Sequence, residues 1–233
     1  MIITIDGPAG SGKSTAARKL AARLGVPYLD TGAMYRVVTL AALRRRVDLH
    51  DDAGLAEIAR GDDWDLDPGP THIRATLHGD DVTEEIRSMY VADHTRFIAA
   101  SPSVRAVLVA RQREIGARLG SMVTEGRDQG SVAFPNADVK FYLDAAIDKR
   151  AERRFHELLA EGEEVSMADV LRNLAERDES DSRRAVAPLR RPDGAIDVDT
   201  TQLSIHEVVD RMAAEVERVA LLPSGASTEA RES

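Results

Sequence analysis

The sequence predicts an α/β fold in which helices cover a parallel sheet and a small antiparallel insertion interrupts the pattern. Short apolar runs alternate with amphipathic segments at helical spacing, which is typical of strands joined by helical crossovers. Segment 71–77 instead alternates polar and apolar residues, as a half-exposed antiparallel strand does. The length of 233 residues, 43% of them hydrophobic, is enough for one such domain with its insertion.

The elements expected in the first half of the chain follow from local composition. A β-branched run forms the first strand, and the alanines and leucines that follow recur at helical spacing until Gly25 ends the helix. A later helix opens at Ser101-Pro102, with serine as N-cap and proline in the first turn. The expected strands are 1–5, 26–29 and 71–77, with a turn at 79–81, and the expected helices are about 13–24, 33–45 and 91–100 and one from 102 onward.

The second half continues the same alternation. Core strands are expected at 122–124 and 139–143, and a charged helix at 147–160. Ser166 opens the next helix with a capping pattern, and Ser204 opens the last one with a capping box. We expect the small, polar residues 222–233 to form a flexible tail.

Composition excludes several classes of protein. The net charge of -9 argues against a non-specific nucleic-acid binder, so we expect no nucleic-acid partner. The absence of cysteine excludes disulfides, thiol catalysis and cysteine-ligated metals. The N-terminus lacks the features of a signal peptide, and no apolar run approaches the roughly 20 residues of a membrane span. We therefore expect a cytoplasmic protein without a membrane partner.

A phosphate-binding loop follows the first strand. Residues 7–14 fit G-x-x-x-x-G-K-S/T and lie between a strand and a helix, as this motif requires. Backbone N–H groups and the helix N-terminus would surround the β-phosphate, Lys13 would reach the β- and γ-phosphates, and the Ser14 hydroxyl would ligate Mg²⁺. The residues expected to bind ATP are Gly7, Pro8, Ala9, Gly10, Ser11, Gly12, Lys13, Ser14 and Thr15.

This loop alone does not distinguish a GTPase, a motor ATPase and a small-molecule kinase. The chain lacks the Asn-Lys-x-Asp motif of a GTPase and is short for an ATPase with a coupling domain. A kinase needs a second anion pocket for its acceptor, and arginine suits phosphate because its guanidinium is bidentate and always charged. Two sets of arginines have helical spacing. The first is Arg150, Arg153 and Arg154, and the second is Arg177 and Arg184 with Asp181 between them. For the first set, the alternative interpretation as a solvated helix face stays open.

Several motifs together resemble the bacterial cytidylate kinase (CMP/dCMP kinase) family over about residues 1–221. They are the phosphate loop with Asp6 ahead of it, 30–36 (Asp-Thr-Gly-Ala-Met-Tyr-Arg), 79–87, 125–128 (Glu-Gly-Arg-Asp) and 183–189. The resemblance implies a P-loop kinase fold of three layers with a short lid. Its expected parts are a core at 1–32, 101–147 and 194–221, a monophosphate-binding region at about 33–100 with an insertion at about 62–90, and a lid at about 148–190.

The resemblance also implies roles for individual residues. The acceptor phosphate would contact Thr31, Arg36, Arg127 and Arg184, cytosine would face Arg105 and Asp128, and the sugar would contact Arg177 and Asp181. The transferring phosphoryl group would lie under Arg150, Arg153 and Arg154, and Glu125 would orient Mg²⁺ through water. A carboxylate such as Asp128 accepts from the amino group of cytosine and faces an acceptor in uracil. The chain departs from the family pattern at Arg96, where a serine is expected, and at Gln129, where an apolar residue is expected.

The function expected from this resemblance is transfer of the γ-phosphoryl group of Mg-ATP to CMP and dCMP by a monomer. An alternative is a kinase of another small acceptor, such as UMP, AMP or a shikimate-like metabolite. A second alternative, from a different class, is a nucleotide-dependent switch that hydrolyses ATP while signalling to a partner. The second arginine pocket argues against the switch, because a switch needs no acceptor site.

Overall fold

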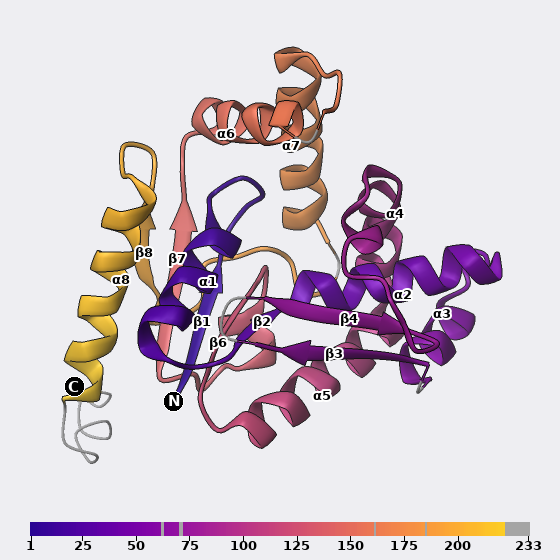
Figure 1. The fold of residues 1–233 in the computed structure, drawn as a ribbon, viewed down its shortest axis with the longest axis horizontal. Coiled ribbons are helices and arrows are strands. Elements are labelled where there is room, and N and C mark those ends of the chain that lie inside the picture. The colour runs from indigo at the N-terminus through magenta and orange to yellow at the C-terminus, as the bar shows by residue number, and fades with distance from the viewer. Residues whose placement is uncertain (62, 70–71, 161, 185, 222–233) are drawn as a thin grey trace.

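The structure, a computed structural model, describes residues 1–221 except 62, 70, 71, 161 and 185. Its centre is a five-stranded sheet in the order β2-β6-β1-β7-β8, and all neighbouring strands pair in parallel (Figure 1). The strands are β1 (Ile2–Asp6), β2 (Tyr28–Asp30), β6 (Met122–Gly126), β7 (Val139–Asp144) and β8 (Ile196–Asp199). The predicted fold class is therefore confirmed.

Helices cover this sheet and bury its apolar side chains. Helix α1 (Lys13–Leu24) packs against β1 and β6 and against α8 (Ile205–Ala220). A π-helix, η2 (Gln129–Ala133), packs on β1, and α5 (Pro102–Leu119) packs on η2. Side chains of β1 point to alternate faces, so Thr4 and Asp6 face η2. The sheet thus places the carboxyl end of β1 between the phosphate loop and η2.

The predicted antiparallel insertion is confirmed. Strands β3 (Trp64–Pro68), β4 (Ile73–Leu77) and β5 (Asp80–Asp81) form a three-stranded antiparallel sheet. Trp64, Leu66, Ile73, Ala75 and Leu77 are its buried side chains, and they join the main core. The sheet lies beside α2 (Thr31–Arg45), and the chain then continues through η1 (Glu85–Arg87) and α4 (Met89–Ala100) (Figure 1).

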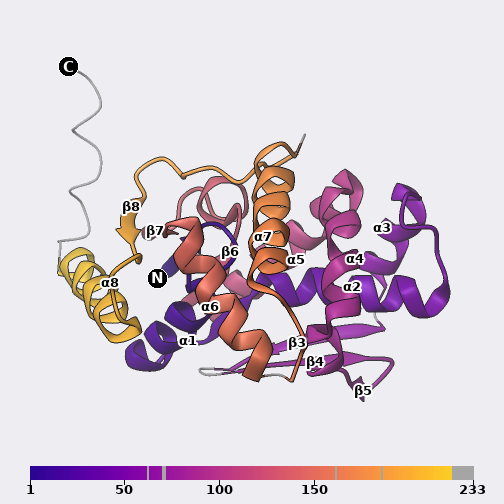
Figure 2. The ribbon, with the colours of Figure 1, turned by 90° about the horizontal axis from the view of Figure 1, so that it is seen from above.

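Two helices, α6 (Ile147–Ala160) and α7 (Met167–Ser182), form a hairpin over the carboxyl end of the sheet (Figures 1 and 2). They have a small hydrophobic core of their own, which contains Ala151, Leu158, Val170 and Leu174. Ala9 of the phosphate loop belongs to this same core. The hairpin of α6 and α7 therefore packs directly on the loop that the sequence assigns to ATP.

Side-chain capping explains where several of the helices begin. Ser101, Ser166 and Ser204 are N-caps as predicted, and Ser204 forms a complete capping box with Glu207. Helix α2 begins at Thr31, earlier than expected, because the Asp30 carboxylate accepts the N–H of Ala33 and caps it.

Several element boundaries differ from the predictions. The strand expected at 26–29 is shorter and later, because the N–H of Val26 bonds to Ala21 O and closes α1. Helix α3 (Asp52–Arg60) and strand β8 are additional elements, and β5 lies within the expected turn. The flexible tail expected at 222–233, the start of the strand expected at 71 and the expected start of the insertion at 62 lie outside the described residues.

Candidate active site

The phosphate loop joins β1 to α1 at the carboxyl end of the sheet, where α/β proteins bind ligands. Gly7 has φ of 148°, and a Cβ atom there would lie 1.9 Å from Leu143 O. A Cβ on Gly10, with φ of 74°, would lie 3.1 Å from Arg150 Cβ. The glycines therefore let the loop pass close to β7 on one side and to α6 on the other. Gly12 caps α1, and Lys13, Ser14 and Thr15 form its first turn.

Lys13 is held inside this loop. Its side chain is buried with 5% of the residue exposed, and Nζ donates to Pro8 O at 2.6 Å. The Ser11 hydroxyl donates to the same carbonyl oxygen at 3.0 Å. Burial, and to a lesser extent the nearby charge of Arg127, lowers the pKa of Lys13 to about 7, against the attraction of Glu125. An anion in the loop would raise this pKa again, because it favours the charged ammonium.

Two oxygen donors meet beside Lys13. Ser14 Oγ donates to Glu125 Oε1 at 2.7 Å, and the Tyr28 hydroxyl donates to the same oxygen at 3.3 Å. Burial raises the pKa of Glu125, and the neighbouring Asp30 raises it further. Hydroxyl and carboxylate oxygens suit Mg²⁺, which usually takes one or two protein ligands and completes its shell with phosphates and water. Within the described ranges no three His, Cys, Asp or Glu residues gather into a metal cluster, and a two-donor site is consistent with this.

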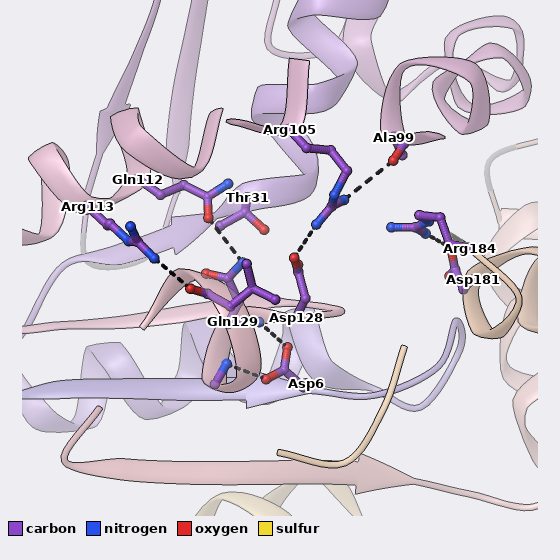
Figure 3. A network of polar contacts seen from close by, with 12 residues as sticks. Asp6, Thr31, Ala99, Arg105, Gln112, Arg113, Asp128, Gln129, Asp181 and Arg184 are labelled. Atoms are coloured by element: carbon purple, nitrogen blue, oxygen red, sulfur yellow. Dashed lines mark hydrogen bonds and ion pairs between the residues drawn. The ribbon is translucent and has the colours of Figure 1, made fainter. Parts of the chain in front are cut away.

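A second group of cations lies around two carboxylates. Arg127 Nε donates to Asp181 Oδ2 at 2.7 Å, and Arg184 pairs with Asp181 Oδ1 (Figure 3 draws the Arg184 pair). Arg36 Nη2 donates to Asp30 Oδ2 at 2.7 Å. Burial disfavours the Asp181 carboxylate, but Arg127 and Arg184 outweigh it and hold its pKa below the ordinary value. The arginines come from α2, the loop after β6 and the segment after α7, and so converge from distant parts of the chain.

Thr31 lies at the start of α2, next to this cluster. Its hydroxyl donates to Glu125 O at 2.8 Å, which ties the first turn of α2 to β6. Arg36 Nε is buried and has no hydrogen-bond partner among the described residues. A buried guanidinium N–H without an acceptor is costly, so this atom is a candidate contact for an anion.

A buried ion pair lies behind the arginine cluster. Arg105 on α5 pairs with Asp128, which follows Arg127 directly, and Arg105 Nη1 also reaches Ala99 O at 3.5 Å (Figure 3). The Arg105 guanidinium lies 5.7 Å from the centre of the Tyr35 ring. Burial raises the pKa of Asp128, although Arg105 and Arg184 oppose the shift. The pair expected to read the base is therefore assembled, with each residue bound to the other.

The arginines of α6 have different surroundings. Arg150 is buried, and its guanidinium donates to Ala9 O at 3.0 Å and pairs with Asp178 of α7 at 2.7 Å. Arg153 donates to Thr200 O at 2.5 Å, and the Thr200 hydroxyl donates in turn to Ser11 O at 3.1 Å. Both side chains thus brace the phosphate loop. Among the described residues, the ion-pair partner of Arg154 is Glu157 of its own helix, at 3.1 Å.

The second arginine set spans the end of α7. Arg177 and Asp181 lie one turn apart on α7, and Arg177 is exposed. The helix ends at Ser182, so Arg184 lies beyond it and is not on the helical face that its spacing predicted, yet Arg184 still pairs with Asp181.

The two residues that depart from the family pattern, Arg96 and Gln129, lie in different surroundings. Arg96 is exposed over the ring of Phe97, whereas Gln129 is buried beside Asp128.

Sequence reasoning assigned no role to Asp6, Gln112 or Asp178, which all contact this site. Asp178 binds Arg150, and Gln112 accepts from Gln129 Nε2 at 3.2 Å. Asp6 is fully buried and accepts two backbone N–H groups. A carboxylate at the end of an otherwise apolar strand was the available signal for Asp6, since a buried charge is rare without a purpose. Gln112 had no comparable signal, whereas Asp178 is one of the acidic residues near the arginine sets in the sequence.

The described residues contain no helix that is both long and apolar enough to cross a membrane.

Known proteins resemble the chain over most of its length. The sequence pattern of the family described as Cytidylate kinase matches residues 3–218. A Cytidylate kinase from Rhodococcus opacus is 46% identical over 212 residues, which are 91% of this chain and 93% of the relative. A Cytidylate kinase from Geobacter sulfurreducens is 47% identical over 212 residues, 91% of each chain. The solved structure of TT1252 from Thermus thermophilus aligns with a TM-score of 0.50 and 18% identity, covering 95% of this chain and 98% of that one, and shows a similar fold.

Proposed function

This chain belongs to the cytidylate kinase family, and from that premise we propose how its residues divide the work of phosphorylating CMP with ATP. The enzyme is a CMP kinase, with ATP as phosphoryl donor. The second cation cluster, which consists of Arg36, Arg127 and Arg184, is the observation that supports the residue assignment. It adjoins the donor loop, because the charge of Arg127 helps to lower the pKa of Lys13. A kinase needs two adjoining anion sites, and the chain provides both.

The phosphate loop holds the donor. Backbone N–H groups and the N-terminus of α1 bind the β-phosphate, and Lys13 exchanges its contact with Pro8 O for phosphate oxygens. Ser14 and Glu125 would hold Mg²⁺, directly for Ser14 and through water for Glu125. When bound, Mg²⁺ neutralises charge on the β- and γ-phosphates. The contact between Ser14 and Glu125 supports this assignment, because it already brings both oxygen donors together.

The arginine cluster and Thr31 hold the acceptor phosphate. Arg127 and Arg184 share the oxygens of Asp181, and a phosphate replaces these carboxylate contacts with its own oxygens. Arg36 contributes the buried Nε that has no partner among the described residues. Arg177 and Asp181 then contact the sugar, and both CMP and dCMP are proposed as acceptors. The acceptor phosphate is already ionised at neutral pH, so positioning and charge neutralisation carry the transfer without a strong general base.

Arg105 and Asp128 read the base. The Asp128 carboxylate accepts from the amino group of cytosine, while the position of the carboxylate is fixed by Arg105. Uracil presents a carbonyl at the same place, which leaves Asp128 facing another acceptor. An unpaired buried polar contact costs about 1–3 kcal/mol, or about 5- to 150-fold in discrimination.

The lid arginines have separate tasks. Arg154, whose partner is on its own helix, reaches the transferring phosphoryl group when α6 and α7 close. Arg150 and Arg153 hold the phosphate loop in shape from the same helix. Closure excludes water and suppresses hydrolysis of ATP. All these side chains belong to one chain, and we propose a cytoplasmic monomer that works without nucleic-acid or membrane partners.

The test is an acceptor panel. ADP release is measured with CMP, dCMP, UMP, AMP and shikimate at equal concentrations, with ATP and Mg²⁺ in excess. The expected result is fast turnover with CMP and dCMP and at least about tenfold slower turnover with the others. A CMP rate no higher than the rate with UMP, AMP or shikimate would refute the proposed acceptor.

A further inference from the structure

Asp6 is the last residue of β1, directly before the phosphate loop, and its side chain has no contact with solvent. Its two carboxylate oxygens each accept one backbone N–H at 2.7 Å, Oδ1 from Gln129 and Oδ2 from Gly130. These are the two residues that follow Asp128. Figure 3 shows the carboxylate below the turn that carries Asp128. One buried side chain therefore connects the strand that leads into the donor loop with the turn expected to read the base.

The same turn is fixed from its other side by the Gln129 side chain. Thr124 Oγ1 donates to Gln129 Oε1 at 3.0 Å. Gln129 Nε2 donates to Gln112 Oε1 at 3.2 Å (Figure 3). Gln112 and Arg105 lie two helical turns apart on one face of α5. The consecutive residues Asp128 and Gln129 thus meet two side chains of one helix, so the turn can move only if these contacts break.

We propose that Asp6 is a positioning residue for base recognition, which sets the place of the Asp128 carboxylate relative to Arg105 and to the donor loop. This inference rests on the proposed reading of cytosine by Arg105 and Asp128. Because Asp6 is fully buried, we expect its side chain to contact neither ATP nor CMP. It acts by holding the backbone of residues 129 and 130, while Gln112 and Gln129 hold the same turn against α5.

The carboxylate is needed because both of its oxygens are acceptors. Asparagine has the same shape but one acceptor oxygen, so its amide N–H₂ would face the N–H of either residue 129 or residue 130. A buried donor facing another donor is unfavourable, and the turn would shift to relieve it. Steric space is limited on this side, because a Cβ on Gly130 would already lie 2.9 Å from Thr4 Oγ1. The shift would therefore move Asp128 rather than be absorbed locally.

The experiment compares Asp6→Asn with the wild-type enzyme in kcat and KM for CMP, UMP and ATP. We expect the ratio of kcat/KM for CMP to that for UMP to fall about tenfold or more, with a raised KM for CMP, while KM for ATP changes less than about threefold. Asp138→Asn is the matched control, because the Asp138 carboxylate accepts the N–H of Ile2 at the opposite end of the same strand. This control should leave the CMP-to-UMP ratio unchanged.

A purely structural role gives a different result. In that case Asp6→Asn lowers the melting temperature, or lowers kcat equally for both acceptors, while the CMP-to-UMP ratio stays at the wild-type value, and the inference is wrong. If Asp6→Asn does not fold, Gln112→Met takes its place, because it loosens the same turn through one neutral hydrogen bond. The ratio should then fall about 2- to 10-fold, and an unchanged ratio would overturn the inference. A wild-type enzyme without preference for CMP would instead refute the proposed function, so the two failures are distinguishable.

Discussion

Asp128→Asn is the substitution that separates base recognition from phosphate binding most clearly. The Arg105 and Asp128 side chains are 4% and 7% exposed, so water does not replace a lost contact. Asparagine keeps one acceptor oxygen but removes the negative charge and adds an N–H₂ donor. A hydrogen bond to a charged group contributes about 1.5–3 kcal/mol, so kcat/KM for CMP should fall about 10- to 150-fold. The new donor can pair with the uracil carbonyl, so kcat/KM for UMP should fall less or rise.

The assay is ADP release with CMP and with UMP, over a range of each acceptor at saturating ATP. The variant also leaves Arg105 without its anionic partner in a buried site, which costs up to about 3–5 kcal/mol of folding stability. Circular dichroism at the assay temperature therefore accompanies the kinetics. Asp81→Asn is the control, because it removes the charge of an exposed pair with Arg74. A folded Asp128→Asn enzyme with a CMP-to-UMP ratio within about threefold of wild type would refute the reasoning.

Three further predictions concern the donor side. At pH 8, one unit above its lowered pKa of about 7, Lys13 is mostly neutral, and the bound ATP anion restores its charge. Calorimetry of ATP binding in buffers of different ionisation enthalpy should therefore find an uptake of about half to one proton per ATP. The Lys13→Met variant should take up none. Arg150→Met should lower the free energy of unfolding in urea by about 1–3 kcal/mol, because Asp178, only partly exposed, and Ala9 O lose their donor; an unchanged midpoint contradicts this. Gly7→Ala should weaken ATP binding at least about 100-fold, since its Cβ would lie 1.9 Å from Leu143 O; near-normal ATP affinity would count against the loop geometry.

Local signals in the sequence predicted most of the fold. Serine caps at 101, 166 and 204 placed three helix starts, and the alternation in 71–77 indicated the insertion. Helix α3 was missed because it is only nine residues long and contains Gly54, which weakens the helical pattern. Strand β8 was missed because four residues with two aspartates resemble a loop more than a core strand.

The candidate site was predictable where one motif carried it and unpredictable where contacts cross the chain. The phosphate loop needed only its own spacing and its neighbours. Helical spacing indicated that Arg150 and its neighbours share a face, but not that Arg150 lies buried against Ala9 O. The bonds from Asp6 to residues 129 and 130 join positions more than a hundred residues apart, and only the register of the folded sheet brings them together.

The central claim is that the γ-phosphoryl group passes from the donor loop to an acceptor held by the arginine cluster of the same chain. Following γ-³²P-labelled ATP in a single turnover, with and without CMP, tests it directly. The account predicts that the label appears in CDP when CMP is present and that little inorganic phosphate forms without CMP. It also predicts that Lys13→Ala abolishes the labelling of CDP. Label released as inorganic phosphate at the same rate with or without CMP would contradict the account and indicate a hydrolase or nucleotide switch.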